Sequence, residues 1–168
     1  SFTLLYVDGL AEPDGSVAAA LARAVASQHG RAEPAVSFDV LPRLHAAASG
    51  GDATVAVDEA DRVVAVWPGF VDAAYGVAVD IGSTTIAGHL CELTTGEVLT
   101  SAGRMNPQIR FGEDLMSRVS YVMMNPGGER QLTAAVRTAL DELAGELLEA
   151  IGAARDRVLE VVLVGNPI

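Results

Sequence analysis

The chain has 168 residues, enough for one domain or two small ones, and half of its residues are apolar. Its net charge of −11 argues against binding to nucleic acid or to an anionic membrane, because an acidic surface repels phosphate groups. Its one cysteine, Cys91, excludes an internal disulfide and cannot alone hold an iron–sulfur cluster or a structural zinc ion. No apolar run reaches the roughly 20 residues that span a bilayer, and residues 1–7 are typical of a strand, so we expect a cytoplasmic protein.

The first 70 residues predict a small α/β domain with the order βααββ. Val17, Leu21 and Val25 recur at helical spacing, and Gly30 supplies the stop of that first helix. The predicted elements are a strand over residues 2–7, this helix, a second helix over residues 41–48, and strands over residues 53–57 and 62–67.

A second domain is predicted over residues 75–168, after a boundary between residues 68 and 75 where a Pro-Gly pair interrupts the pattern. Three strands joined by short turns indicate an antiparallel meander, and two helices and a strand follow it. The predicted elements are strands over residues 75–81, 85–93 and 97–102, helices over residues 112–124 and 129–151, and a strand over residues 158–164. The longer helix carries one apolar stripe, formed by Leu132, Val136, Leu140, Leu143, Leu147 and Ile151.

The order β-β-β-α-α-β is the opening of a ribonuclease-H-like domain, the fold of the actin-like ATPases. The last strand is almost wholly apolar, which is typical of a strand buried on both faces of a parallel sheet. That fold normally continues with further helices and strands, and without them the sheet would keep an unprotected edge. We therefore expect the first half of such a domain, in a truncated or proteolysed chain.

The strongest chemical signal is the turn after the first strand of the second domain. Asp80 ends that strand, Gly82 lets the backbone approach a ligand closely, and Ser83, Thr84 and Thr85 supply small hydroxyl groups. Such a hairpin can aim several backbone N–H groups at phosphate oxygens, while the carboxylate suits a water-mediated Mg²⁺ ion. The alternative is an ordinary hairpin whose polar side chains satisfy its own turn.

Two further places carry candidate polar groups. A dense polar loop follows the third strand of the meander, and it either faces a cleft or partner or forms plain turn and helix-start chemistry. Its candidate residues are Arg104, Asn106, Gln108, Arg110, Glu113 and Asp114. Gly165 and Asn166 follow the last strand, where open α/β sheets place ligand groups, unless Asn166 is only a turn residue.

These segments together resemble a known family. The turn over residues 80–85 is similar to the D-x-G-[ST]-T phosphate motif of actin, sugar kinases and heat-shock ATPases. With N-P-Q-x-R-x-G-E-D over residues 106–114, and with residues 117–121 and 164–168, it resembles the reductive activators of corrinoid enzymes. The match covers about residues 75–168, and the preceding residues resemble the small middle domain of that family by position.

The resemblance implies a longer parent protein that is an ATP-dependent iron–sulfur protein and returns Co(II) corrinoid to Co(I) for methyl transfer. It implies Mg-ATP as ligand, a [2Fe-2S] cluster in an upstream domain, and a corrinoid protein or corrinoid-dependent methyltransferase as partner. It implies that Asp80 is catalytic and binds Mg²⁺ through water, and that the nucleotide is bound by Gly82, Ser83, Thr84, Thr85, Gly165 and Asn166. The chain departs from the family in having no cluster cysteines, one D-x-G and no second lobe, so we expect no independent ATP turnover.

Two alternatives to the reductive activator remain open at this point. Another actin-like ATPase or sugar-kinase relative would share the hairpin but should lack the stretch over residues 106–114. A non-enzymatic reading makes residues 1–70 a docking or dimerisation module, with a homodimer as its product.

Overall fold

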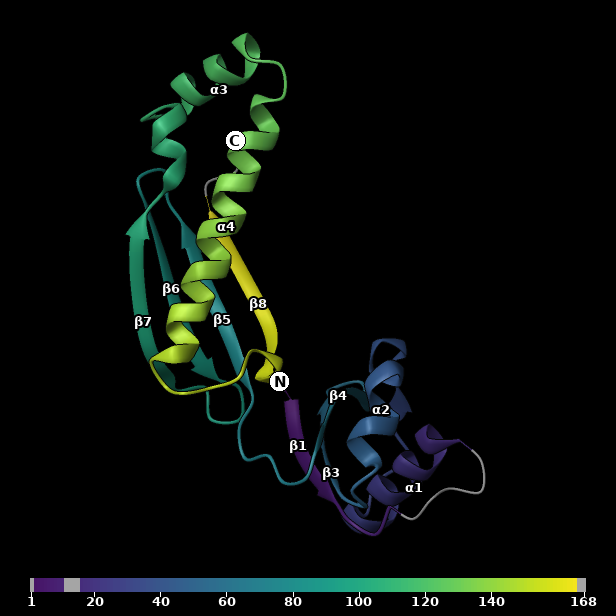
Figure 1. Cartoon of the computed structure of the whole chain (residues 1–168). Coiled ribbons are helices and arrows are strands. Elements are labelled where there is room, and N and C mark those ends of the chain that lie inside the picture. The colour runs from purple at the N-terminus through teal and green to yellow at the C-terminus, as the bar shows by residue number, and fades with distance from the viewer. Residues whose placement is uncertain (1, 11–15, 166–168) are drawn as a thin grey trace. The chain divides into compact units, whose positions relative to one another are not determined.

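The computed structural model of the protein describes residues 2–10 and 16–165 (Figure 1). It divides into two compact units, Ser1–Ala74 and Tyr75–Ile168, and each has a sheet and a hydrophobic core of its own. None of the helices in the described residues has the length and apolar character that crossing a membrane requires.

The first unit is a four-stranded sheet with two helices. Its strand order is β1-β3-β4-β2, and β3 pairs antiparallel with both of its neighbours. The elements are β1 (Phe2–Val7), α1 (Val17–His29), β2 (Ala35–Val36), the 3₁₀ turn η1 (Phe38–Val40), α2 (Leu41–Ala48), β3 (Ala53–Asp58) and β4 (Arg62–Pro68). The predicted βααββ order is thus confirmed, with the two-residue strand β2 and the 3₁₀ turn added.

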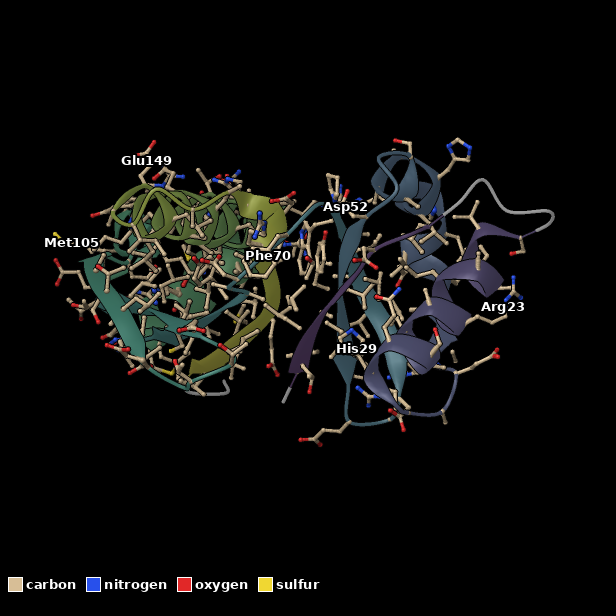
Figure 2. All side chains as sticks on the ribbon, turned by 90° about the horizontal axis from the view of Figure 1, so that it is seen from below. Arg23, His29, Asp52, Phe70, Met105 and Glu149 are labelled. Atoms are coloured by element: carbon tan, nitrogen blue, oxygen red, sulfur yellow. The ribbon has the colours of Figure 1, made fainter. Side chains whose placement is uncertain are left out.

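Both helices of this unit pack their apolar stripes against the sheet. Leu21 and Val25 of α1 are fully buried, and they share one core with Leu44 of α2 and Val55 of β3. Gly30 ends α1 in the left-handed conformation, with φ of 62°, which a residue with a side chain adopts poorly. His29 at the end of α1 (Figure 2) has its Nε2 atom 2.7 Å from the Tyr6 carbonyl oxygen, which ties the helix end to β1.

The second unit has the strand order β7-β6-β5-β8. The first three strands form the predicted antiparallel meander, and β8 returns to pair parallel with β5. The elements are β5 (Tyr75–Ile81), β6 (Thr85–Glu92), β7 (Val98–Met105), the 3₁₀ turn η2 (Pro107–Phe111), α3 (Leu115–Met124), α4 (Gly128–Glu149), the 3₁₀ turn η3 (Arg155–Arg157) and β8 (Val158–Gly165). This confirms the β-β-β-α-α-β opening of a ribonuclease-H-like domain.

Helix α4 covers the sheet and supplies much of the core, as Figure 1 shows. Leu143 and Leu147 are buried against β6, where Gly88 leaves the space that the Leu143 side chain fills. The predicted stripe is only partly right at its first turns, because Leu132 and Val136 are half-buried, whereas Ala135 and Ala139 beside them are buried.

The predicted helix over residues 112–124 begins later than expected. Residues 107–111 form a 3₁₀ turn, and α3 starts only at Leu115, after the cap residue Asp114. The Asp114 carboxylate accepts from the Ser117 backbone N–H at 2.8 Å, and the Ser117 hydroxyl lies 3.1 Å from the Asp114 N–H, which completes a capping box.

The prediction that the last strand is buried on both faces is wrong for this chain. Strand β8 is the edge of its sheet, and Val161, Val162, Leu163 and Val164 are between 48% and 58% exposed. Helix α4 packs mainly over β6 and β7, on the far side of the sheet order from β8.

Candidate functional site

The turn between β5 and β6 lies exposed at one end of its sheet. The last ladder pair is Ile81 with Ile86, and the Gly82 N–H donates to the Thr85 carbonyl at 2.9 Å to close the turn. A Cβ atom on Gly82 would lie 2.7 Å from that same carbonyl oxygen, so the turn requires glycine here for space. Asp80 is exposed at the end of β5, and residues 83–85 are exposed as well. We call residues 80–85 the hairpin.

The carbonyl groups of this hairpin are held from one side by the polar loop. The Asn106 side-chain Nδ2 donates to the Gly82 carbonyl at 2.9 Å, and the Asn106 backbone N–H donates to the Thr84 carbonyl at 2.8 Å. The Arg118 guanidinium donates to the Ser83 carbonyl that lies between them. Within the described residues, the Ser83 and Thr84 N–H groups donate to no protein oxygen. Three carbonyls of the turn are therefore engaged, whereas these two amides have no protein acceptor in the described part of the chain.

Two of the predicted loop candidates are engaged in contacts within the unit, and of these Asn106 is buried and Gln108 is half-buried. Asn106 is 1% exposed, and its side-chain oxygen accepts from the Gln108 N–H at 2.9 Å. Gln108 donates to the Leu132 carbonyl of α4 at 3.1 Å and accepts from Arg118 at 3.3 Å. Asn106 thus contacts the hairpin, and Gln108 contacts helices α3 and α4.

The other loop candidates are spread over the surface of the unit. Arg104 on β7 pairs with Glu142 and Glu146 of α4, at 2.6 and 2.9 Å. Arg110 is exposed, with its guanidinium carbon 4.7 Å from the centroid of the Phe111 ring. Glu113 is exposed, and Asp114 caps α3. The structure does not gather these four side chains into one cluster.

The capping role of Asp114 affects its titration. The pKa of the Asp114 carboxyl lies below its ordinary value, chiefly because the charged form accepts a hydrogen bond from the Ser117 backbone N–H. The Ser117 hydroxyl adds to this lowering. Asp114 is therefore a helix-start acid in this structure, which was the simpler of its two interpretations.

Gly165 lies beside the hairpin although the two are far apart in sequence. The parallel ladder between β5 and β8 ends on the pair Ile81 and Gly165, directly before the turn. A Cβ atom on Gly165 would lie 3.2 Å from the Ile81 carbonyl oxygen. Asn166, the other candidate at this strand end, lies outside the described residues.

Sequence reasoning gave no role to Arg118. It is the only charged residue of α3, yet it is 6% exposed, and its guanidinium also donates to the Gly112 carbonyl at 2.9 Å. The sequence did contain a signal, because Arg118 is the one charged residue on a helix of otherwise uncharged residues. Charged residues are rarely buried unless they have a partner, so a buried Arg118 needs acceptors such as these carbonyls.

The residues present fit Mg-ATP and do not fit an iron–sulfur cluster. The hairpin offers free amides, hydroxyl groups and one exposed carboxylate, which suits a Mg²⁺ ion held mainly by phosphates and water. No group of three or more histidine, cysteine, aspartate or glutamate residues in the described part of the chain forms a metal cage. A [2Fe-2S] cluster needs four ligands, and Cys91 alone supplies one thiolate.

Residues 75–168, the whole of the second unit, match the family described as the RACo middle region. This chain belongs to that family. The corrinoid activation enzyme RamQ of Eubacterium limosum is 30% identical over 92 residues, which is 55% of this chain and 16% of RamQ. The solved structure of a reductive activator for a corrinoid, iron–sulfur protein aligns over 98% of this chain with a TM-score of 0.72 and 26% identity.

The comparisons confirm the resemblance to reductive activators of corrinoid enzymes. The structural alignment extends through both units, so it includes the residues that resembled the family only by position. The chain spans 28% of the chain of the solved activator and a smaller share of RamQ. Membership in this family favours the reductive activator over the sugar-kinase and docking-module alternatives.

Proposed function

We propose that the second unit contributes a phosphate-binding hairpin to a Mg-ATP site in a reductive activator of corrinoid proteins. The observation that carries this proposal is that the Ser83 and Thr84 N–H groups donate to no protein oxygen within the described residues, in an exposed turn that follows the exposed Asp80. Consecutive free amides in a turn form a concave anion site, because their partial positive charges converge. The hydroxyl groups of residues 83–85 add further donors to the same phosphate oxygens.

Asp80 has a separate task in this site. A carboxylate repels phosphate, so it contributes to binding only through a cation that it shares with the nucleotide. Mg²⁺ keeps several waters and binds one or two carboxylates together with substrate phosphates. The exposure of Asp80 leaves room for such a hydrated ion.

In the full-length protein, this site would couple ATP to a one-electron reduction of Co(II) corrinoid to Co(I). The electron would come from a [2Fe-2S] cluster in another part of that protein, since this chain lacks the cysteines to hold one. The partner would be a corrinoid protein or a corrinoid-dependent methyltransferase. The chain alone would bind nucleotide without supporting turnover, because it spans only 28% of the solved activator that it matches.

The test is isothermal titration calorimetry of the full-length protein with Mg-ATP, comparing wild type with Asp80→Asn. We expect the variant to bind Mg-ATP about tenfold more weakly or worse, since it loses the charged partner of the ion. In EDTA the variant should bind metal-free ATP more tightly than wild type does, because removing the negative charge of Asp80 relieves its repulsion of the phosphates. Reductive activation should fall with the Mg-ATP affinity.

Asp39→Asn is the matched control, because Asp39 is an exposed aspartate in the first unit. Its affinity for Mg-ATP should equal that of wild type. Unchanged Mg-ATP binding in Asp80→Asn would remove this carboxylate from the site, and a wild-type protein that binds no Mg-ATP would refute the nucleotide site as a whole.

A further inference from the structure

We infer that Arg118 and Asn106 are positioning residues of the hairpin, and that Arg118 also supplies the positive charge behind it. This inference rests on the proposed function, because it explains how that hairpin presents its amides to an anion. In this view, residues of the polar stretch over residues 106–118 affect the bound anion without contacting it. They do so by holding the backbone of the hairpin.

The first step follows from the geometry of the peptide unit. A trans peptide is planar, and its C=O and N–H groups point in opposite directions. The described residues contain no cis peptide bond. Asn106 holds the Gly82 carbonyl, so the N–H of Ser83 in that peptide unit points away from Asn106. Arg118 holds the Ser83 carbonyl and turns the Thr84 N–H away in the same manner. The two free amides are thus the outward ends of two clamped peptide units.

The orientation of the Asn106 side chain is determined by its neighbours. Its oxygen accepts from the Gln108 N–H at 2.9 Å, which leaves the nitrogen to face the Gly82 carbonyl at 2.9 Å. Aspartate has the same shape as asparagine but replaces that nitrogen with a second acceptor. The change Asn106→Asp would therefore repel the Gly82 carbonyl and release the first clamp.

The charge of Arg118 has no anionic partner in the described part of the chain. Its guanidinium donates to the Gly112 carbonyl, the Gln108 side-chain oxygen and the Ser83 carbonyl, all of which are neutral. The positive charge of Arg118 lowers the pKa of the Asp114 carboxyl, but it is the weakest of the causes that do so. A buried cation without an anion is costly, so a phosphate group at the hairpin would offset that cost.

The same contact strengthens the donor that faces the ligand. A cation bound to the Ser83 carbonyl polarises that peptide unit, which makes the Thr84 N–H more positive. Charge-assisted hydrogen bonds are stronger than neutral ones. Electrostatic interactions are also stronger in a site that excludes water than in bulk water. Arg118 therefore acts on the anion through one peptide unit, without touching it.

The experiment is calorimetry of the full-length protein with Mg-ATP, using Arg118→Met, Arg118→Lys and Asn106→Asp. Arg118→Met removes the charge while keeping a long side chain, and we expect its affinity to fall about 30-fold or more. Arg118→Lys keeps the charge but loses the planar, forked set of guanidinium donors. Its affinity for Mg-ATP should be higher than that of Arg118→Met and within about tenfold of wild type. A purely structural role predicts no such rescue by charge.

The control Arg155→Met makes the same change of charge at the opposite end of the sheet. Arg155 pairs with Asp141 of α4, and it precedes the start of β8, whereas the hairpin adjoins the end of β8. Its affinity for Mg-ATP should equal that of wild type. Melting temperatures measured without ligand identify any variant that fails to fold. If Arg118→Met fails to fold, the affinities of Arg118→Lys and Asn106→Asp for Mg-ATP test the positioning role instead.

The outcomes separate this inference from the proposed function. If wild type binds no Mg-ATP, the proposed function fails and the inference fails with it. If wild type binds Mg-ATP and a folded Arg118→Met protein binds it equally well, only the inference is overturned. Equal losses in folded Arg118→Met and Arg118→Lys would overturn the role of the charge.

Discussion

At the scale of single residues, the direction of a polar group decides its task. Asn106 and Gln108 were predicted to face either a cleft or a turn, and they face the backbone of the hairpin and of α4. The residue types alone do not distinguish these cases, since an amide side chain serves a ligand or a carbonyl equally well. Gly82 differs, because the turn has no room for a Cβ atom at this position.

We expect Gly82→Ala to weaken Mg-ATP binding strongly while Gly103→Ala does not. A Cβ atom at Gly82 would lie 2.7 Å from the Thr85 carbonyl oxygen, so the turn must open. A Cβ atom at Gly103 would lie 3.7 Å from the Ile86 carbonyl oxygen, which is an ordinary contact. Calorimetry on the full-length protein should give a loss of about tenfold or more for the first variant only. Equal affinities would show that the turn conformation does not matter for binding.

At the scale of elements, α3 is held at its start and exposed along its length. Asp114 and Ser117 form the capping box, and Arg118 anchors the first turn to the hairpin. Met116, Met123 and Met124 are between 68% and 81% exposed. Few core contacts hold this helix, so its stability depends on the cap more than that of α4 does.

We expect Asp114→Ala to lower the melting temperature by a few degrees at pH 7, because α3 loses its cap. The pKa of Asp114 is lowered in the folded protein, so its contribution is complete above the unfolded value of about 3.9. The contribution disappears as the pH falls through the lowered pKa of the folded state. Circular dichroism melts at pH 7 and in strong acid should therefore show the difference from wild type shrinking in acid.

Asp114→Asn is the control, since asparagine caps a helix about as well as aspartate. It should melt close to wild type at pH 7, and its cap should not titrate. A difference between Asp114→Ala and wild type that stays constant down to strong acid would contradict the role of the charged cap.

At the scale of the whole molecule, the chain holds two separate cores. Leu21, Val25 and Val55 belong to the core of the first unit, and Leu90 and Leu143 belong to that of the second. Each four-stranded sheet is formed only by strands of its own unit. Such units are expected to fold as independent cooperative blocks.

We expect two unfolding transitions in urea, one for each unit. Leu21→Ala and Leu143→Ala each remove a fully buried side chain and should each cost about 2–5 kcal/mol of unfolding free energy. Each variant should shift one transition and leave the other in place. Trp67 is the one tryptophan of the chain and lies in the first unit, so its fluorescence reports on the unfolding of that unit. A single transition that both variants shift equally would contradict the independence of the units.

Residue spacing alone determined the α/β class, the order of the main helices and strands, and the position of the hairpin. These features follow from local periodicity and turn chemistry, as at Gly30, which ends α1, and at residues 82–85, which join β5 to β6. Only the tertiary structure decided that β8 is an exposed edge, and that Arg118 and Asn106 clamp the hairpin. The reason is that burial and hydrogen bonding depend on partners distant in sequence, such as Ser83 and Arg118, whose contact no local pattern encodes.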